Sequence, residues 1–404
     1  MKIISEVNKY GLSYSILPVA SAETACIQLI GRVGSNQDQL NGTVSTNPCP
    51  SKIGLSHLLE HTVIENSPTK TLLNKLVSMG NKFIAATSRD EVIFGVHVLK
   101  QDIKLGIELM ASILNDDLNE NLNLKQVKNT VTSEIYRNEN NSRKKARQNF
   151  YTSLYPNTRL ALQNIGDAHS ISKITFADLK VHKYSLYHPR NFKLVIAGKL
   201  AQKDISPEIN KIGSPNLTRV NASTYKFQAN PQNDSINTKY TKEKLKYFIG
   251  GCENVLGTSP LKYPSLILAN IVRPHFNNIL KNAGLAYKNS VDAYCGQSFG
   301  TFTFYAEIAP EKAKILPLIV NKLINTLTLT QSDVDIATNR LIADLIFLNE
   351  KIAFKTNYYA ENFLHNPEFS DHLQEIHKIK KVKITQVEQA LETIRKNPKV
   401  FVTD

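Results

Sequence analysis

A polar segment divides this chain of 404 residues into two series of alternating strand and helix patterns. Residues 201–240 hold prolines among Asn, Ser, Gln and Thr, with few apolar positions. This composition is typical of a linker between domains. We therefore expect a first domain at 1–200, a linker at 201–240 and a second domain at 241–404. Their similar layouts suggest a duplicated α+β domain, and the chain is long enough for two or three domains.

The apolar pattern predicts the elements of each half. Alternation of apolar and polar residues predicts half-buried strands, and a period near 3.6 predicts helices that cover them. We expect strands or strand pairs at 12–18, 24–33, 82–98, 192–198 and 287–308. We expect helices from about Gly54 over His61, from a cap at Thr69 to Met79, and at 101–114, 124–137, 261–280 and 311–327. Residues 34–52 are rich in Asn, Gly, Ser, Thr and Pro, which predicts a surface loop.

The segment His57-Leu58-Leu59-Glu60-His61 carries the chemistry of the first half. On a helix, a spacing of four residues puts both imidazoles on one face, where they can share a cation. Zinc binds neutral imidazole nitrogen, and a catalytic zinc needs three protein ligands and a water. Glu60 points to the same side, where a carboxylate can take a proton from that water. The alternative reading of the bare pattern is two surface histidines that flank a glutamate in an amphipathic helix.

The surroundings of this segment resemble the pitrilysin, insulysin and mitochondrial processing peptidase family of inverzincins. The similar segments run over nearly the whole chain: Gly54 to His61, Val33-Gly34-Ser35, Ala86 to Asp90, Tyr187 to Asn191 and Gly284-Leu285-Ala286-Tyr287. The resemblance implies that His57, His61 and Glu134, in Ser133-Glu134-Ile135, bind one Zn²⁺ and that Glu60 is the base. Glu139 is a second candidate for the third ligand and fits less well.

Other positions depart from the family pattern. Val127 stands where the family usually carries a second glutamate, so the outer support of the metal differs. Ile84 replaces a substrate-binding asparagine, which leaves substrate contacts to the main chain around Ala85. The family's arginine position is Leu280, or Lys281 if one residue is gapped.

At the family's arginine position, Lys281 would supply a positive charge without the planar guanidinium fork of arginine. The resemblance implies that Tyr287 helps to hold the developing oxyanion. The alternative for Tyr287 is an aromatic residue that packs on a strand.

The resemblance implies a fold of two homologous domains, each a mainly antiparallel sheet packed by helices, which close like a clam around a chamber. It implies a zinc-dependent endopeptidase that hydrolyses peptides or unfolded segments, as a homodimer or as a heterodimer with a related subunit. One alternative is a weakly active or structural subunit of a heterodimeric peptidase, motivated by the departures described above. The other is a non-enzymatic interaction protein of the same fold, against which the intact metal ligands count.

Charge and cysteine usage narrow the class of protein. The net charge is +14, from 49 basic and 35 acidic residues, but the lysines are spread widely, which favours a solvated basic face over specific nucleic-acid binding. A basic cavity for acidic peptides stays open. The 4 cysteines have no Cys-x-x-Cys spacing and are expected to be reduced thiols. No segment has the apolar length of a transmembrane helix, and the first residues lack a signal-peptide pattern, so we expect a cytoplasmic protein.

Overall fold

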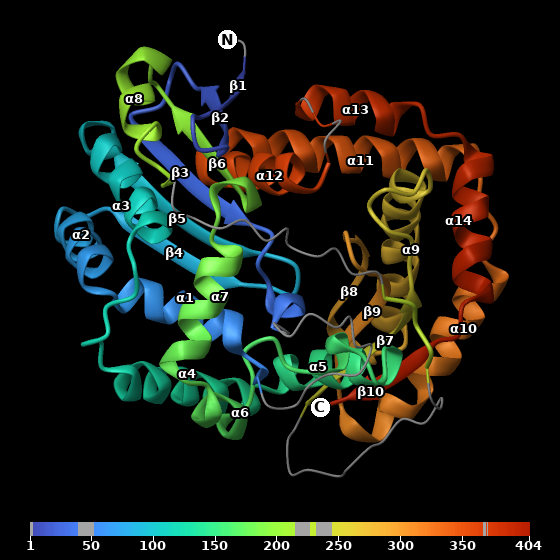
Figure 1. The fold of residues 1–404 in the computed structure, drawn as a ribbon. Helices are drawn as coiled ribbons and strands as arrows, with labels where there is room; N and C mark the ends of the chain where they lie inside the picture. The colour runs from blue at the N-terminus through green and yellow to red at the C-terminus, as the bar shows by residue number, and fades with distance from the viewer. Residues whose placement is uncertain (1–2, 39–51, 215–226, 232–244, 367–368, 370) are drawn as a thin grey trace. The chain divides into compact units, whose positions relative to one another are not determined.

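The computed structural model describes residues 3–38, 52–214, 227–231, 245–366, 369 and 371–404. The fold is α+β (Figure 1), and the chain forms two compact units. The first unit comprises Met1–Ile135, Gln163–Ser223 and Phe347–Ser370, and the second comprises Tyr136–Leu162, Thr224–Ile346 and Asp371–Asp404. Each unit therefore takes segments from both halves of the sequence.

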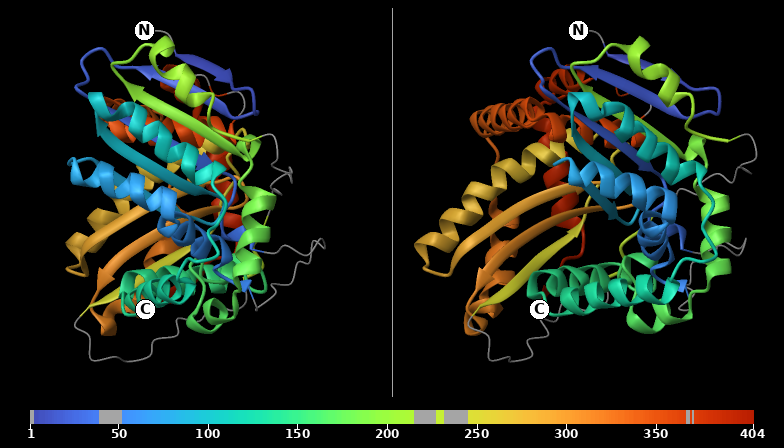
Figure 2. Two further views of the ribbon diagram at one scale, coloured as in Figure 1. Left: turned by 60° about the vertical axis from the view of Figure 1, so that its left-hand side comes forward. Right: turned by 90° about the vertical axis from the view of Figure 1, so that its left-hand side faces the viewer.

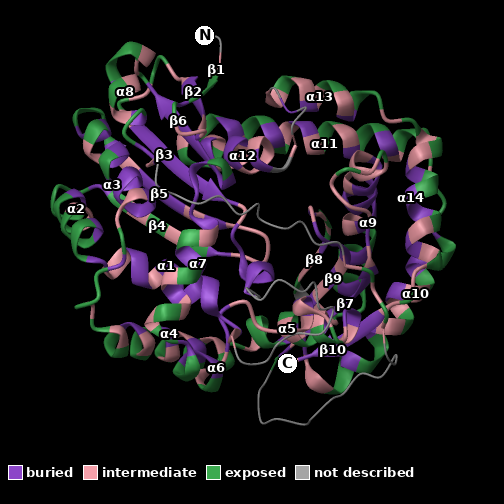
Figure 3. Ribbon diagram, in the orientation of Figure 1, coloured by how far each residue is buried: buried purple, intermediate pink, exposed green. Residues whose placement is uncertain are grey.

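The first unit contains a sheet of six strands in the order β1-β2-β6-β3-β5-β4. All neighbouring strands are antiparallel except β2 and β6, which are parallel. The central strands β3 and β6 are buried along nearly their whole length, which Figure 3 shows as a continuous purple layer. Burial on both faces explains their near-continuous apolar sequences. The strands are β1 (Ile4–Val7), β2 (Ser13–Pro18), β3 (Thr24–Gly31), β4 (Lys82–Thr87), β5 (Val92–Leu99) and β6 (Phe192–Gly198).

One face of this sheet packs against helices from the first half of the sequence. Alternate strand residues such as Ile27, Leu29 and Phe94 point to these helices and form one large buried cluster with them. The helices that contribute to this cluster are α1 (Leu55–Glu65), α2 (Ser67–Ser78), α3 (Ile103–Asn115), α4 (Leu124–Glu139), α6 (Ala168–Lys173), α7 (Phe176–Leu186) and α8 (Gln202–Ile209).

The opposite face of the same sheet packs against α12 (Ile352–His365), from the second half of the sequence (Figure 1). Val195 and Ala360 belong to the apolar cluster between them. The Gln28 amide donates a hydrogen bond of 2.7 Å to Asn357. The Arg32 guanidinium donates to the carbonyl oxygen of Leu364 in the last turn of α12, a favourable place for a cation because of the helix dipole.

The second unit contains an antiparallel sheet of four strands in the order β10-β7-β9-β8. Phe304 lies on one face of this sheet and packs against Phe276 of α9 (Lys262–Asn282), with ring centroids 5.3 Å apart. Ile249 lies on the other face, in a cluster with Phe150 of α5 (Ser142–Leu154). Figure 2 gives two further views of these elements. The strands are β7 (Lys246–Glu253), β8 (Ala286–Cys295), β9 (Gly300–Ile308) and β10 (Val400–Thr403).

Helices α5 and α12 explain why the units differ from the simple division expected from the sequence. Each comes from one half of the sequence and packs on the sheet whose strands come from the other half. Segment 201–240, expected as a linker, begins with α8, whose Ile205 and Ile209 are buried in the first unit. The remaining helices are α10 (Leu316–Thr326), α11 (Gln331–Glu350), α13 (His372–Lys380) and α14 (Ile384–Lys396). Within the described residues, no helix has the length and apolarity needed to cross a membrane.

Three local expectations from the sequence are corrected. Helix α2 starts at Ser67 with Pro68 in its first turn, so Thr69 lies inside the helix and not at its cap. Residues 35–38 form a buried turn, not surface loop, while 39–51 lie outside the described residues. The expected helix at 311–327 begins as a 3-10 turn over Pro310–Ile315, and α10 starts only after it.

Candidate metal centre

The start of α1 is fixed by a glycine and a buried carboxylate. Gly54 has a φ of 87°, in the left-handed region that favours glycine. A Cβ there would lie 2.7 Å from the carbonyl oxygen of Ile165 and 2.9 Å from the Cα of Gly166. Asp38 accepts hydrogen bonds of 2.8 Å from the backbone N–H groups of both Gly54 and Ser56. These bonds satisfy N–H groups that have no partner within the helix, as a capping side chain does.

The first turn of α1 is also tied to its neighbours through Ser56. Its hydroxyl lies 3.0 Å from the carbonyl oxygen of Gly34, to which it donates, and 2.9 Å from Nε2 of His182 in α7. His182 is fully buried, so it is a structural histidine. The helix that carries the His-x-x-Glu-His segment is thus held at its N-terminus from several sides.

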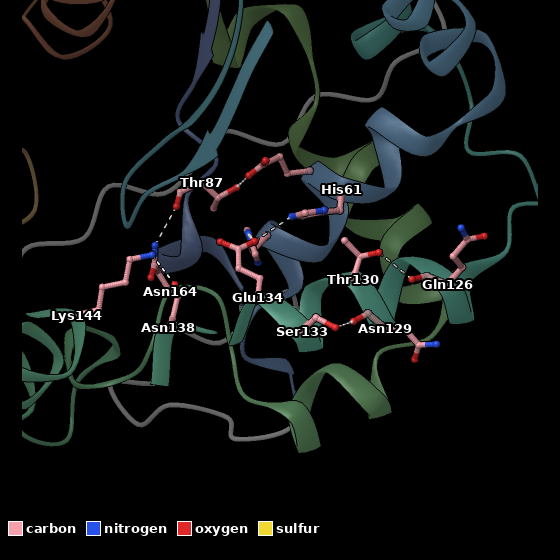
Figure 4. Close-up of polar contacts among 12 residues, drawn as sticks. His61, Thr87, Gln126, Asn129, Thr130, Ser133, Glu134, Asn138, Lys144 and Asn164 are labelled. Atoms are coloured by element: carbon pink, nitrogen blue, oxygen red, sulfur yellow. Dashed lines mark hydrogen bonds and ion pairs between the residues drawn. The ribbon is translucent and has the colours of Figure 1, made fainter. Parts of the chain in front are cut away.

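His57, His61 and Glu134 converge, as the family resemblance implies. The ring centroids of the two histidines lie 4.8 Å apart. The Glu134 Oε2 atom, on α4, lies 3.6 Å from His57 Nε2 and 3.5 Å from His61 Nε2 (Figure 4). One ligand atom from each of the three residues lies within 4.8 Å of the other two. Among the described residues, this is the only such group of three or more His, Cys, Asp or Glu side chains.

These separations fit a zinc ion. Two ligand atoms that each lie about 2.0–2.1 Å from a tetrahedral zinc are about 3.3–3.4 Å apart. The two observed histidine–glutamate distances are only slightly longer. The side chains of His61 and Glu134 are 23% and 25% exposed, whereas that of His57 is 6% exposed. The group is therefore open on one side, as a catalytic site needs for a water and a substrate.

The charges around His61 also favour a cation. Burial lowers the pKa of His61, but the hydrogen bond to Glu134 and the nearby Glu60, Glu134 and Glu65 carboxylates outweigh burial, so the pKa is raised. The same negative field that holds a proton on the imidazole attracts a divalent metal. Because the ligand must be neutral imidazole, proton and metal compete for this nitrogen.

Glu60 lies in the same helix but bonds elsewhere. Its side chain is buried, and Oε2 accepts a hydrogen bond of 2.6 Å from the hydroxyl of Thr87, at the end of β4. The side-chain amide of Asn164 in turn donates to the backbone carbonyl of Thr87 (Figure 4). Burial raises the pKa of Glu60 and outweighs the Thr87 hydrogen bond, which lowers it. A carboxyl group whose pKa moves toward neutrality suits a general base.

The departures from the family pattern have defined places in the first unit. Val127 is buried on α4 in the main core, so an apolar side chain fills the place of the expected second glutamate. Ile84 and Ala85 lie on β4, the strand at the edge of the sheet. Ala85 is half-buried and pairs with Phe94, whereas Ile84 is 58% exposed.

The remaining predicted site residues belong to the second unit. Leu280 is fully buried in α9, so its side chain is a core residue. Lys281 follows it and is exposed. Tyr287 lies in β8, close to an irregularity in the pairing with β9, and its side chain is outside what the structure describes. Roles for Lys281 and Tyr287 at the metal centre stay predictions.

Sequence reasoning missed the supports of the site. The sequence assigns no role to Asp38, Ser56 or Thr87, because no pattern of residue types marks them as supports of the histidines. Ser56 and Thr87 lie in segments that resemble the family, and this resemblance is the signal that could have found them. Asp38 lies at the start of a polar stretch that was read as surface loop, and so its burial was hidden.

Comparisons with known proteins agree with the geometry. Residues 45–168 match the family model described as Insulinase (Peptidase family M16). These residues include α1, β4 and all of α4 with Glu134. A protein of Rickettsia bellii named as an uncharacterized zinc protease is 23% identical over 371 residues, which cover 88% of this chain and 86% of the relative.

Two solved structures share the fold over the whole chain. A Pseudomonas fluorescens protein, described as an inactive domain of peptidase family M16, has a TM-score of 0.81 at 17% identity, and the match covers 100% of this chain and 97% of that one. A chain of complex III from Candida albicans has a TM-score of 0.83 at 16% identity, with 99% and 95% covered. Identities this low establish a common fold, and proteins of this fold include one described as inactive.

Proposed function

We propose that this chain, whose residues 45–168 match the insulinase family model, is a zinc-dependent endopeptidase of that family that hydrolyses peptides or unfolded segments. One observation carries the proposal. Three side chains with the donor atoms that zinc prefers converge beside a buried carboxylate that is not needed as a ligand.

Each residue of the group has a separate task. His57, His61 and Glu134 hold the metal. Bound zinc would supply a Lewis acid that lowers the pKa of its water from about 15.7 toward 7. Glu60 takes the proton from the water that attacks the peptide carbonyl carbon, and returns it to the leaving amine nitrogen. Thr87 keeps the Glu60 carboxylate in one orientation through its short hydrogen bond.

The edge of β4 offers a place for the substrate main chain. An edge strand presents N–H and C=O groups that can pair with an added strand, and an extended peptide can bind in this way. Strand β4 ends at Thr87, which contacts Glu60, so a peptide paired with Ala85 would lead toward the metal ligands.

A second candidate is a weakly active subunit that needs a partner. The buried Leu280 cannot supply a charge to a substrate, and Lys281 supplies charge without the fork of arginine. The solved relatives include a domain described as inactive and a chain of complex III. Homodimer and heterodimer both remain proposals, as do the role of Tyr287 and a cytoplasmic location.

Metal analysis and peptide cleavage test the proposal together. The purified full chain is loaded with zinc, dialysed, analysed for metal and incubated with a peptide library. We expect about one zinc per chain and cleavage that is lost in Glu60→Gln, which keeps the metal. We expect Glu134→Gln to lose both bound zinc and peptide cleavage. Glu139→Gln, a matched change at the exposed end of α4, should keep both zinc and cleavage.

Each result decides between the candidates. Absence of bound zinc in the wild type overturns the metal site. Zinc binding with cleavage by Glu60→Gln at the rate of the wild type overturns the mechanism. Zinc binding without cleavage favours the partner-dependent subunit, which is then tested by adding a related chain.

A further inference from the structure

The exposed residues of β4 follow a strict alternation. Lys82, Ile84 and Ala86 are exposed on one face of the strand, whereas Phe83 and Ala85 are half-buried and Thr87 is buried on the other. Strand β4 is the last strand of the sheet, so within the described residues its outer edge pairs with no other strand. A peptide that joined this edge would place every second side chain beside the exposed row.

Ile84 is the large apolar residue among the exposed residues of β4. It is 58% exposed and lies opposite Gly95 of β5. A Cβ on Gly95 would lie 2.9 Å from Cγ1 of Ile84, so the isoleucine side chain covers the glycine. The far side of Ile84, toward the free edge, is left for another apolar side chain.

Lys82 gives the same row a positive charge two residues away. It lies opposite His97, whose pKa is lowered by burial and by the positive charge of Lys82. Nε2 of His97 is already engaged at 2.8 Å with the hydroxyl of Thr24. Among the described residues, no acidic side chain forms an ion pair with Lys82. Its charge is thus available to a bound chain.

We propose that Lys82 and Ile84 select peptides that carry an acidic residue and an apolar residue two positions apart, with the acidic residue farther from the cut. This inference rests on the proposed peptidase function and specifies its substrate class. The spacing of two holds for either strand direction, because neighbours on one face of a strand are two residues apart. Ion pairs and apolar pairs across neighbouring strands are each expected to change affinity by about 1.4- to fivefold.

The position of the cut follows from the length of β4. Lys82 lies five residues before Thr87, which contacts the base, so the two ends of the paired segment are roughly 17 Å apart at about 3.3–3.4 Å per residue. The acidic residue is therefore expected about five residues from the residue beside Thr87, and the apolar residue about three.

A peptide library read out in two ways tests the inference with the zinc-loaded full chain. Cleavage is measured with the wild type, and binding of the same peptides is measured with Glu60→Gln. We expect acidic and apolar enrichment at the stated spacing in both assays. Lys82→Glu should turn the acidic preference into a basic one, and Ile84→Asn should remove the apolar preference. Lys104→Glu, the same charge change at an exposed position of α3, should leave both preferences intact.

The two readouts separate this inference from the peptidase function. Cleavage without these preferences, or preferences unchanged in Lys82→Glu and Ile84→Asn, overturns the inference and leaves the function standing. Selective binding to Glu60→Gln without cleavage by the wild type supports the inference and overturns the function. If the peptides are neither bound by Glu60→Gln nor cleaved by the wild type, both the inference and the proposed function are overturned.

Discussion

Thr87 donates its hydroxyl proton to Oε2 of Glu60 across 2.6 Å, and both side chains are buried. Thr87 is the last residue of the edge strand β4, and Glu60 lies in the helix that carries the two histidines. The hydrogen bond therefore joins the strand that a peptide would pair with to the group that would move the proton. A change at Thr87 is expected to act on the base without touching a metal ligand.

Replacement of Thr87 by valine keeps the shape and removes the donor. Because this hydrogen bond lowers the pKa of Glu60 against the effect of burial, its loss should raise that pKa further. Since a base must be ionised, the acidic limb of the profile of kcat/KM against pH should move to higher pH. A hydrogen bond to a charged group is worth about 1.5–3 kcal/mol, so kcat should fall by roughly tenfold or more.

Thr87→Ser is the matched control, because it keeps the hydroxyl and should keep the profile near that of the wild type. Zinc content should be equal in all three proteins. A Thr87→Val protein with an unshifted acidic limb would contradict a role in orienting Glu60.

Alanine substitutions at two glycines with the same φ separate the cost of backbone strain from the cost of steric crowding. Gly54 and Gly80 both have a φ of 87°, but a Cβ at Gly80 meets nothing within 4 Å. Alanine at Gly80 should cost only the left-handed conformation, about 1–2 kcal/mol. Alanine at Gly54 should cost more, because backbone atoms of the neighbouring segment lie at 2.7 and 2.9 Å and must move.

The measurement is urea unfolding of both variants, with zinc affinity as a second readout. Gly54→Ala should also weaken zinc binding, because it displaces the start of the ligand helix. Equal losses of unfolding free energy in the two variants would mean that the close approach at Gly54 has no energetic weight.

Removal of the Asp38 carboxylate tests the cap of α1. Asp38→Ala leaves two buried N–H groups without their acceptor, and the free energy of unfolding should fall by about 1–3 kcal/mol. Asp344→Ala, at an exposed position of α11, should change it by less than about 0.5 kcal/mol. Denaturation of both variants at the same pH gives the comparison, and similar small losses would show that water replaces the cap.

The approach of His57 to His61 could be predicted from the sequence because their pattern is local. His57 and His61 need only a helix to face the same way, and the structure has that helix. Glu134 came from the resemblance, since nothing in the residues between α1 and α4 predicts that the two helices meet. Strands β3 to β6 were predicted because their apolar patterns are strong.

The packing of α5 and α12 on sheets whose strands come from the other half of the sequence could not be predicted in the same way. An amphipathic helix shows which of its faces is buried but not which sheet buries it. The Arg32 bond to Leu364 and the Gln28 bond to Asn357 join residues distant in the sequence, and no spacing signals them. The support of Glu60 by Thr87 was missed for the same physical reason.

Zinc should stabilise the chain more strongly as pH rises. Without metal, Glu134 and Glu60 raise the pKa of His61 against burial, so the folded chain binds this proton more tightly than the unfolded chain does. That contribution is complete below the unfolded pKa of about 6.5 and is lost as pH rises through the higher folded value. Zinc replaces the proton, so its binding tightens over the same range.

The difference in Tm between zinc-loaded and metal-free chain should therefore grow from about pH 6 to pH 8. Thermal unfolding of the two forms in matched buffers measures it. A variant with both His57→Ala and His61→Ala should gain no zinc-dependent stability at any pH in this range. If the wild type gains the same Tm from zinc at pH 6 and pH 8, proton and metal do not compete at His61, and the assignment of its Nε2 as a ligand atom fails.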